Sequence, residues 1–310
     1  MLTLGFGIVT ASILALSAVA FTLEYAVTNV ANVAHGEILT VGAYAAYIVH
    51  QRTGNAIAAA VVAALCGGLV ALAMYSSVIG PFLRFGASPT VVFIATLGIS
   101  FVIQNVLVIF FGAANLAYSI DPGSPQQVGP FLFNALDEEI VASAILITIL
   151  LFLVISRTKF GKALRAVSQN RELARVTGIN ATRVAAVTFF IAGLIAGYAG
   201  FILAEQVGTF SPYFGFSFFL ITLTATVAGG LGRAFGTMVG AVIVGLILEF
   251  VPTINTAVVL GPLHALGLPG PAGGYISASY NLAIAFAILA LVILVRPRGL
   301  FTNARRTVFE

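Results

Sequence analysis

Long uncharged apolar runs, separated by short polar breaks, extend along almost the whole chain. A helix that crosses a membrane needs about 20 apolar residues, and most of the runs reach that length. The pattern therefore predicts an all-α integral membrane protein, a bundle of about eight to ten transmembrane or half-membrane helices in a single domain over residues 1–310. We expect helices near Leu4–Ala26, Gly36–Val49, Asn55–Ile79, Pro89–Phe111, Glu139–Ser156, Val184–Glu205, Phe216–Ala228, Phe235–Val251 and Tyr280–Val295.

The composition supports this prediction. Hydrophobic residues make up 60% of the chain, charged residues only 8%, and the mean hydropathy is +1.10. Soluble domains are about one quarter charged, so no stretch is suited to a separate soluble or catalytic domain. The first apolar run lacks the basic start of a secretory signal, and we expect it to be a retained helix. The lone Cys66 excludes a disulfide within the chain and a cysteine metal cluster.

The basic residues predict the orientation in the membrane. Residues 157–183 carry seven Lys or Arg and a single acid, Glu172, and further arginines follow the last helix. Such clusters mark the cytoplasmic side, so both regions are expected there, and no nucleic-acid partner is needed to explain them. Counting spans from them places the acidic loop 121–137 and the N-terminus outside, with Arg52 as an external exception.

Two segments interrupt the apolar pattern in a similar way, TNVANVAHGEILTVGAY at residues 28–44 and TATVAGGLGRAFGTMVGA at residues 224–241. Interrupted segments in two halves of a membrane protein point to a translocation pathway, although ordinary tight turns would give the same pattern. For His35 a role at a helix start is favoured over a role in a gate. The candidate pathway or gate residues are Asn32, His35, Gly36 and Glu37 in the first segment and Gly229, Gly230 and Gly232 in the second.

The basic segment 157–183 is amphipathic rather than membrane-spanning. Phe160, Leu164 and Val167 recur at helical spacing, and Gly178 is a plausible stop. A short helix of this kind suits docking into a groove of a soluble partner, or it lies on anionic lipid headgroups. In either case we expect a partner surface or the membrane to cover Leu164.

Six stretches of the chain carry a resemblance to a known family. In order they are NVAHGEILTVGAY (32–44), ATLGISFVIQNV (95–106), GKALRAVSQNRELARVTGINATRVAAVTF (161–189), SPYFGF (211–216), GGLGRAFGTMVGA (229–241) and RPRGLF (296–301). Together they resemble the branched-chain amino-acid permeases of the LivH type, which are subunits of prokaryotic ABC importers.

The resemblance implies a transport subunit of the prokaryotic cytoplasmic membrane that passes leucine, isoleucine or valine from an extracytoplasmic binding protein. A second permease and two ATPase subunits would complete the complex. The chain has no GxxxxGK[ST] motif, so ATP and Mg²⁺ are expected in the ATPases and no cofactor in this chain. A related permease for another amino acid, urea, an amide or a small organic acid stays open as an alternative. By the same resemblance, the ATPase-coupling residues are Phe160, Gly161, Leu164, Arg165, Val167 and Gly178.

Glu24, Glu205 and Glu249 lie in or at the ends of apolar runs, where a charge is costly and points to function. An ion-coupled secondary transporter would use such residues, but pairing with polar neighbours or a place at the membrane surface is favoured. Glycines one turn apart, Gly193 with Gly197 and Gly236 with Gly240, predict close helix packing. The chain shows no catalytic set of residues, so an enzyme is not expected.

Overall fold

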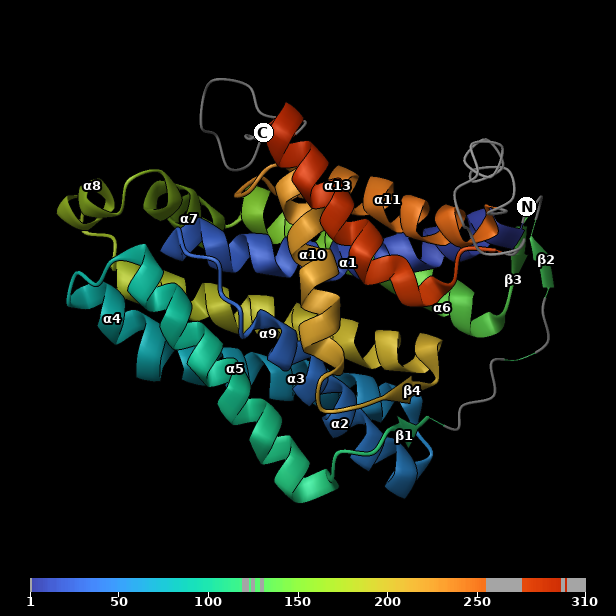
Figure 1. Cartoon of the computed structure of the whole chain (residues 1–310). Coiled ribbons are helices and arrows are strands. Elements are labelled where there is room, and N and C mark those ends of the chain that lie inside the picture. The colour runs from blue at the N-terminus through green and yellow to red at the C-terminus, as the bar shows by residue number, and fades with distance from the viewer. Residues whose placement is uncertain are drawn as a thin grey trace, which may run out of the picture.

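The computed structural model describes residues 2–118, 123, 126–128, 131–254, 275–296 and 299. Nine long helices among these residues correspond one by one to the predicted segments, which confirms the all-α class (Figure 1). They are α1 (Leu2–Thr28), α2 (His35–Thr53), α3 (Ala56–Met74), α5 (Pro89–Phe111), α6 (Ala135–Arg157), α9 (Ala181–Val207), α10 (Phe214–Gly229), α11 (Ala234–Phe250) and α13 (Asn281–Val295).

Six helical stretches are long and apolar enough to cross a membrane, which makes the chain a multi-pass membrane protein. Two further helices, α10 and α13, are apolar but shorter, and α2 is interrupted by charged and polar side chains. The six stretches are Leu4–Thr28, Ala56–Arg84, Pro89–Phe111, Ala135–Arg157, Ala181–Val207 and Ala234–Thr253, where the last includes the 3₁₀ turn η2 (Val251–Thr253).

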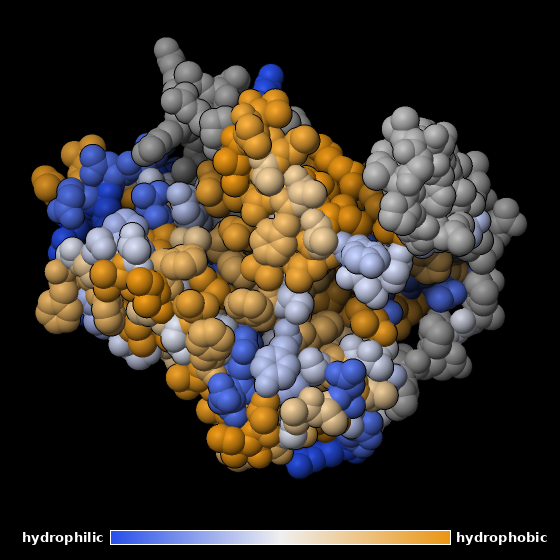
Figure 2. Space-filling view, in the orientation of Figure 1, coloured by the Kyte–Doolittle hydropathy of each residue, from blue (hydrophilic) through white to orange (hydrophobic). Residues whose placement is uncertain are grey.

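The short elements divide between the two ends of the bundle. Helices α4 (Gly80–Arg84), α7 (Lys159–Gln169) and α8 (Arg171–Val176) lie at one end, where hydrophilic side chains gather (Figure 2). The N-terminus and the strands lie at the other end (Figure 1). There β1 (Leu116–Ala117) pairs with β4 (Thr209–Phe210), and β2 (Gln126–Val128) pairs with β3 (Phe131–Phe133). We call the first the basic end, because Arg84, Arg171, Arg175, Arg183 and Arg233 line its two grooves.

Helices α1 and α9 form the centre of the bundle, and α2 and α3 pack on α9 while α11 packs on α1. Small residues make this close packing possible. A side-chain carbon added at Gly193 would meet Ala71 Cβ and the Gly67 carbonyl, each at 2.5 Å, and one added at Gly197 would meet the Ala63 carbonyl. The glycines of α9 therefore serve contacts within this chain.

The third span continues beyond its predicted end at Ile79. A π-helical turn, η1 (Tyr75–Ile79), joins α3 to α4, and the backbone N–H of Gly80 donates to the carbonyl of Tyr75. Pro81 follows directly, and a proline disturbs the regular hydrogen bonds of the preceding turn. The wider π turn absorbs that disturbance, and the helix runs on to Arg84.

A few predictions fall on parts of the chain that the structure does not describe. Most of the loop 121–130, residues 261–274 before the last helix, and Arg298, Arg305 and Arg306 of the C-terminal tail lie outside the described residues. Helix α6 begins at Ala135, four residues before its predicted start, because Asn134 and Asp137 form a capping box. The backbone N–H of Asn134 donates to Oδ2 of Asp137 at 3.0 Å.

Candidate functional site

The first of the two segments that interrupt the apolar pattern contains an irregular stretch, residues 29–34, between α1 and α2. We call this stretch the first break, and the turn between α10 and α11 the second break. The first break leads the chain from the end of α1 back into the bundle. Asn29 has a φ of 55°, and α2 then begins at His35 beside the middle of α1 and α10 (Figure 1). Irregular backbone at membrane depth survives only against protein or water. Here the side chains of Asn32 and Thr96 accept the backbone N–H groups of Ala34 and Val33, each at 3.1 Å.

A buried polar cluster fixes this break to α1. Both oxygens of the Glu24 carboxylate have partners, since Oε1 lies 2.9 Å from Nδ1 of His35 and Oε2 accepts from Nδ2 of Asn32 at 2.8 Å. All three side chains are buried. The favoured pairing of Glu24 with polar neighbours is therefore observed. His35 does not cap a helix, contrary to the favoured expectation, because its ring turns toward Glu24 and no side chain caps α2.

The same cluster reaches α10 through hydroxyl groups. Nε2 of His35 lies 3.5 Å from Oγ of Ser17, which in turn lies 3.0 Å from Oγ1 of Thr222. A second hydroxyl pair connects α1 to α11, since Oγ1 of Thr22 lies 3.0 Å from Oγ1 of Thr237. The break between α1 and α2 is thus connected by hydrogen bonds to the α10–α11 pair, which contains the second break.

Glu37 forms a separate cluster with α5. Its Oε1 accepts from Oγ of Ser100 at 2.8 Å and from Nε2 of Gln104 at 2.7 Å, while its buried Oε2 has no hydrogen-bond partner among the described residues. Ser100 and Gln104 are not among the predicted pathway residues. A detectable signal existed, because Thr96, Ser100 and Gln104 recur every four residues in a mostly apolar span and so share one helix face. That face is the buried side of α5.

The second break is a tight turn. Gly230 and Gly232 have φ values of 110° and 81°, which favour glycine, and they connect α10 to α11. Gly229 packs on the carbonyl of Gly236, and Gly240 packs on the carbonyl of Ala225. These contacts match the alternative interpretation of the second break as a turn.

The structure corrects the expectation for the amphipathic segment. Leu164 is 1% exposed and Val167 is 4% exposed, and both are covered by this chain itself. Helix α7 packs on α6, α9 and α1, and Gly161 lies so close to Ile155 of α6 that a side chain would not fit. No partner or membrane surface is needed to bury Leu164. The apolar stripe is a tertiary contact, which a single sequence does not distinguish from a docking face.

The exposed apolar side chains of this segment lie on α8 instead. Leu173 is 60% exposed and Val176 is 85% exposed, three residues apart on the same helix face. Lys162 and Gly178 are also exposed, while Phe160 and Arg165 are half-buried. These two apolar side chains at the basic end are exposed in this chain, while the stripe on α7 is covered.

One groove connects the basic segment 157–183 to both breaks. It has a volume of about 460 Å³ and lies where the end of α1, the α7–α8 junction and the α10–α11 turn meet. Its walls are residues 25–29, residues 167–169 with Arg171, and residues 231–233. The α7–α8 junction therefore lies beside both the segment that leads into the first break and the second break.

The other intramembrane acids lie near the opposite end of the bundle. Oε1 of Glu249 accepts a hydrogen bond from Oγ1 of Thr10 at 2.8 Å, so this acid is also paired with a polar neighbour. Glu205 is half-buried in the last turn of α9. Among the residues that the structure describes, no three His, Cys, Asp or Glu side chains gather as metal ligands would.

Comparison with known families decides what kind of protein contains this arrangement. A family model described as "Branched-chain amino acid transport system / permease component" matches residues 3–294. The chain belongs to this family. Members of this permease family are transport components, so the breaks and the basic end are to be understood as parts of a transport protein rather than of an enzyme.

Individual relatives agree over most of the chain. The high-affinity branched-chain amino acid transport system permease protein LivH of Escherichia coli (strain K12) is 28% identical, with 95% of this chain and 92% of the relative covered. BraD of Pseudomonas aeruginosa is 27% identical over 95% of this chain and 93% of the relative. A probable LivH of Methanocaldococcus jannaschii is 30% identical over 77% of each chain. No solved structure matches.

Proposed function

We propose that this chain is a membrane-spanning permease subunit of an ATP-driven importer, and that it translocates leucine, isoleucine or valine. The observation that carries the proposal is the family match over residues 3–294, together with relatives of this substrate class that are similar over nearly their whole length. The remaining subunits are a second permease, two ATPases that bind ATP and Mg²⁺, and an extracytoplasmic binding protein. The location is the cytoplasmic membrane of a prokaryote.

The basic end is the cytoplasmic end in this proposal. The arginines that line its two grooves come from four separate parts of the sequence, which the fold brings to one side. Basic residues accumulate in cytoplasmic loops, and the six spans and the shorter helices connect this end to the strands at the other. The binding protein then delivers substrate at the end that carries β1–β4.

The ATPase contact is the exposed face of α8. Leu173 and Val176 suit a hydrophobic groove of a soluble partner, while the buried Leu164 and Val167 attach α7 to the bundle. A rigid attachment is needed if closure of the ATPases is to move the spans. The groove of about 460 Å³ places this movement beside the end of α1 and the α10–α11 turn.

The break between α1 and α2 is the proposed gate region. Its residues lie at membrane depth, and the polar contacts of Asn32, His35 and Glu37 to α1 and α5 are directional. Directional contacts have two discrete states, made or broken, which suits an element that switches between conformations.

Isolation of the tagged chain from native membranes tests the assembly. A permease subunit should carry with it two ATPases and a second permease, identified by mass spectrometry, at fixed ratios to the tagged chain. Recovery of the chain alone or with copies of itself only, under conditions that preserve a tagged control importer, would contradict the proposed complex.

A further inference from the structure

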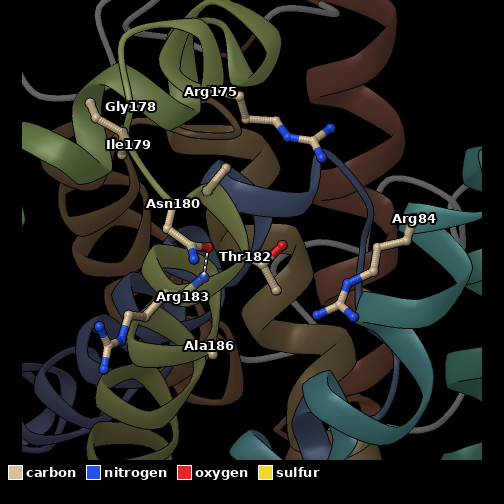
Figure 3. A pocket seen from close by; sticks show the side chains of 9 residues that line it. Arg84, Arg175, Gly178, Ile179, Asn180, Thr182, Arg183 and Ala186 are labelled. Carbon is tan, nitrogen blue, oxygen red and sulfur yellow. Dashed lines mark hydrogen bonds between the residues drawn. The ribbon is translucent and has the colours of Figure 1, made fainter.

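A second, larger groove at the basic end concentrates positive charge (Figure 3). It has a volume of about 740 Å³ and lies between the end of α4 and the turn from α8 into α9. Three arginines from three helices line it, Arg84, Arg175 and Arg183, and none of the described lining residues is acidic. Figure 3 shows the Arg84 and Arg175 side chains extending toward the space around Thr182.

The charge of these arginines is poorly balanced within the chain. In the described part of the protein, Arg84 and Arg183 form no ion pair with a carboxylate, and Arg175 pairs only with Glu172 at 3.6 Å. Both members of that pair are exposed, so solvent screens it. The first turn of α9 also lines the groove, and it adds the partial positive charge of a helix N-terminus.

The two spans that border the groove indicate its position along the membrane normal. Helix α9 has 27 residues, and the continuous stretch Ala56–Arg84 has 29. At 1.5 Å per residue each is about 40 Å long, whereas the hydrocarbon core of a bilayer is about 30 Å thick. Arg183 is the third residue of its span and Arg84 the last of its own, so a bilayer centred on the two spans would have both residues at the level of its headgroups.

We propose that this groove binds the phosphate group of an anionic phospholipid headgroup. Guanidinium groups donate paired hydrogen bonds to phosphate oxygens, and those of Arg84 and Arg175 extend from separate helices toward the space, whereas the guanidinium group of Arg183 points away from them (Figure 3). Phe85, which follows Arg84 and is 87% exposed, adds an apolar side chain at the same level. The bound lipid fixes the cytoplasmic ends of α4 and α9 relative to each other. This inference concerns lipid binding and does not depend on the transported substrate.

Native mass spectrometry of the purified complex tests the proposal. Wild type should retain phosphatidylglycerol in preference to phosphatidylethanolamine. Each basic contact to an anionic surface contributes roughly a factor of five in binding, so Arg84→Gln should weaken retention about fivefold and Arg84→Gln with Arg175→Gln about 25-fold. The matched control is Arg52→Gln with Arg157→Gln, which removes two exposed charges outside the groove and should leave retention unchanged.

Added ligands separate the sources of the phosphate. Short-chain phosphatidylglycerol should raise the melting temperature of wild type and not of the double variant, while inorganic phosphate at the same concentration should have no effect. Equal stabilisation by inorganic phosphate would overturn the lipid assignment in favour of a soluble anion. Unchanged lipid retention in Arg84→Gln with Arg175→Gln, accompanied by loss of the ATPases, would show that the groove is a protein contact instead.

Discussion

Oε1 of Glu24 lies 2.9 Å from Nδ1 of His35, and this contact joins the end of α1 to the first residue of α2. The two residues are 11 positions apart, and both are fully buried. Between them the chain leaves one helix, turns back and begins another at a different depth. The contact is what gives the irregular segment a fixed course through the bundle.

Replacement of the Glu24 carboxylate should therefore destabilise the protein according to what replaces it. Glu24→Ala leaves the buried donors of Asn32 and His35 without an acceptor, at a cost of about 1–3 kcal/mol for each. Glu24→Gln should stay near wild type, because its oxygen accepts from Asn32 and its amide donates to the other tautomer of His35. Thermal melting of the purified protein measures the difference.

Glu172 supplies the control for this prediction. It is an acid in an exposed pair with Arg175, and Glu172→Ala should not change the melting temperature. If Glu24→Ala melted like Glu172→Ala, the buried cluster would not determine the course of the break.

The contrast between Leu164 and Leu173 gives a second prediction. Leu164→Asp places an unpaired carboxylate in the interior and should reduce folding, with low yield and aggregation in detergent. Leu173→Asp changes an exposed position and should leave the fold intact while it weakens ATPase binding. Yield, monodispersity and co-purification of the ATPases are the measurements. A well-folded Leu164→Asp protein that had lost the ATPases would restore α7 as the docking helix.

Replacement of glycine by alanine at a packed and at an open helix position gives a third prediction. An added methyl at Gly197 would meet the Ala63 carbonyl, so Gly197→Ala should cost about 1–3 kcal/mol through overpacking. Gly98→Ala on α5 meets nothing within 4 Å and should be neutral, or stabilising by up to about 1 kcal/mol through helix propensity. Equal melting temperatures for the two variants would contradict the close approach of α3 and α9.

The proposed sidedness is tested by thiol labelling in intact cells, after Cys66→Ala removes the native thiol. Thr53→Cys, at the exposed end of α2, should react with an impermeant reagent. Thr177→Cys, at the basic end, should react only after the membrane is opened. The reverse pattern would invert the orientation and place the ATPase contact on the wrong side of the membrane.

The helices could be predicted from the sequence alone, whereas the contacts between them could not. Apolar runs predicted all nine long helices among the described residues, and the spacing of Phe160, Leu164 and Val167 predicted that they share a helix face. Periodicity indicates that a helix face is apolar but not what covers that face. A partner surface or the membrane was therefore expected to cover Leu164, whereas residues of this chain cover it.

The candidate site shows the same limit. Asn32, His35 and Glu37 stood out because polar residues interrupt an apolar run. Their partners were harder to find, since Ser100 and Gln104 are 63 and 67 positions from Glu37 and only the fold brings them together. The tight turn at Gly230 was recognisable from its glycines, whereas its place beside the α7–α8 junction depends on how α1 and α11 pack.

We propose that ATP hydrolysis by partner subunits drives substrate through this permease. The most direct measurement is uptake of radiolabelled leucine by liposomes that contain the purified complex, with ATP enclosed with the ATPases and the binding protein added on the opposite side. We predict uptake that requires ATP and the binding protein and that is unaffected by ionophores. Leucine uptake by this chain alone, driven by an imposed proton gradient and independent of ATP, would contradict an ATP-driven importer.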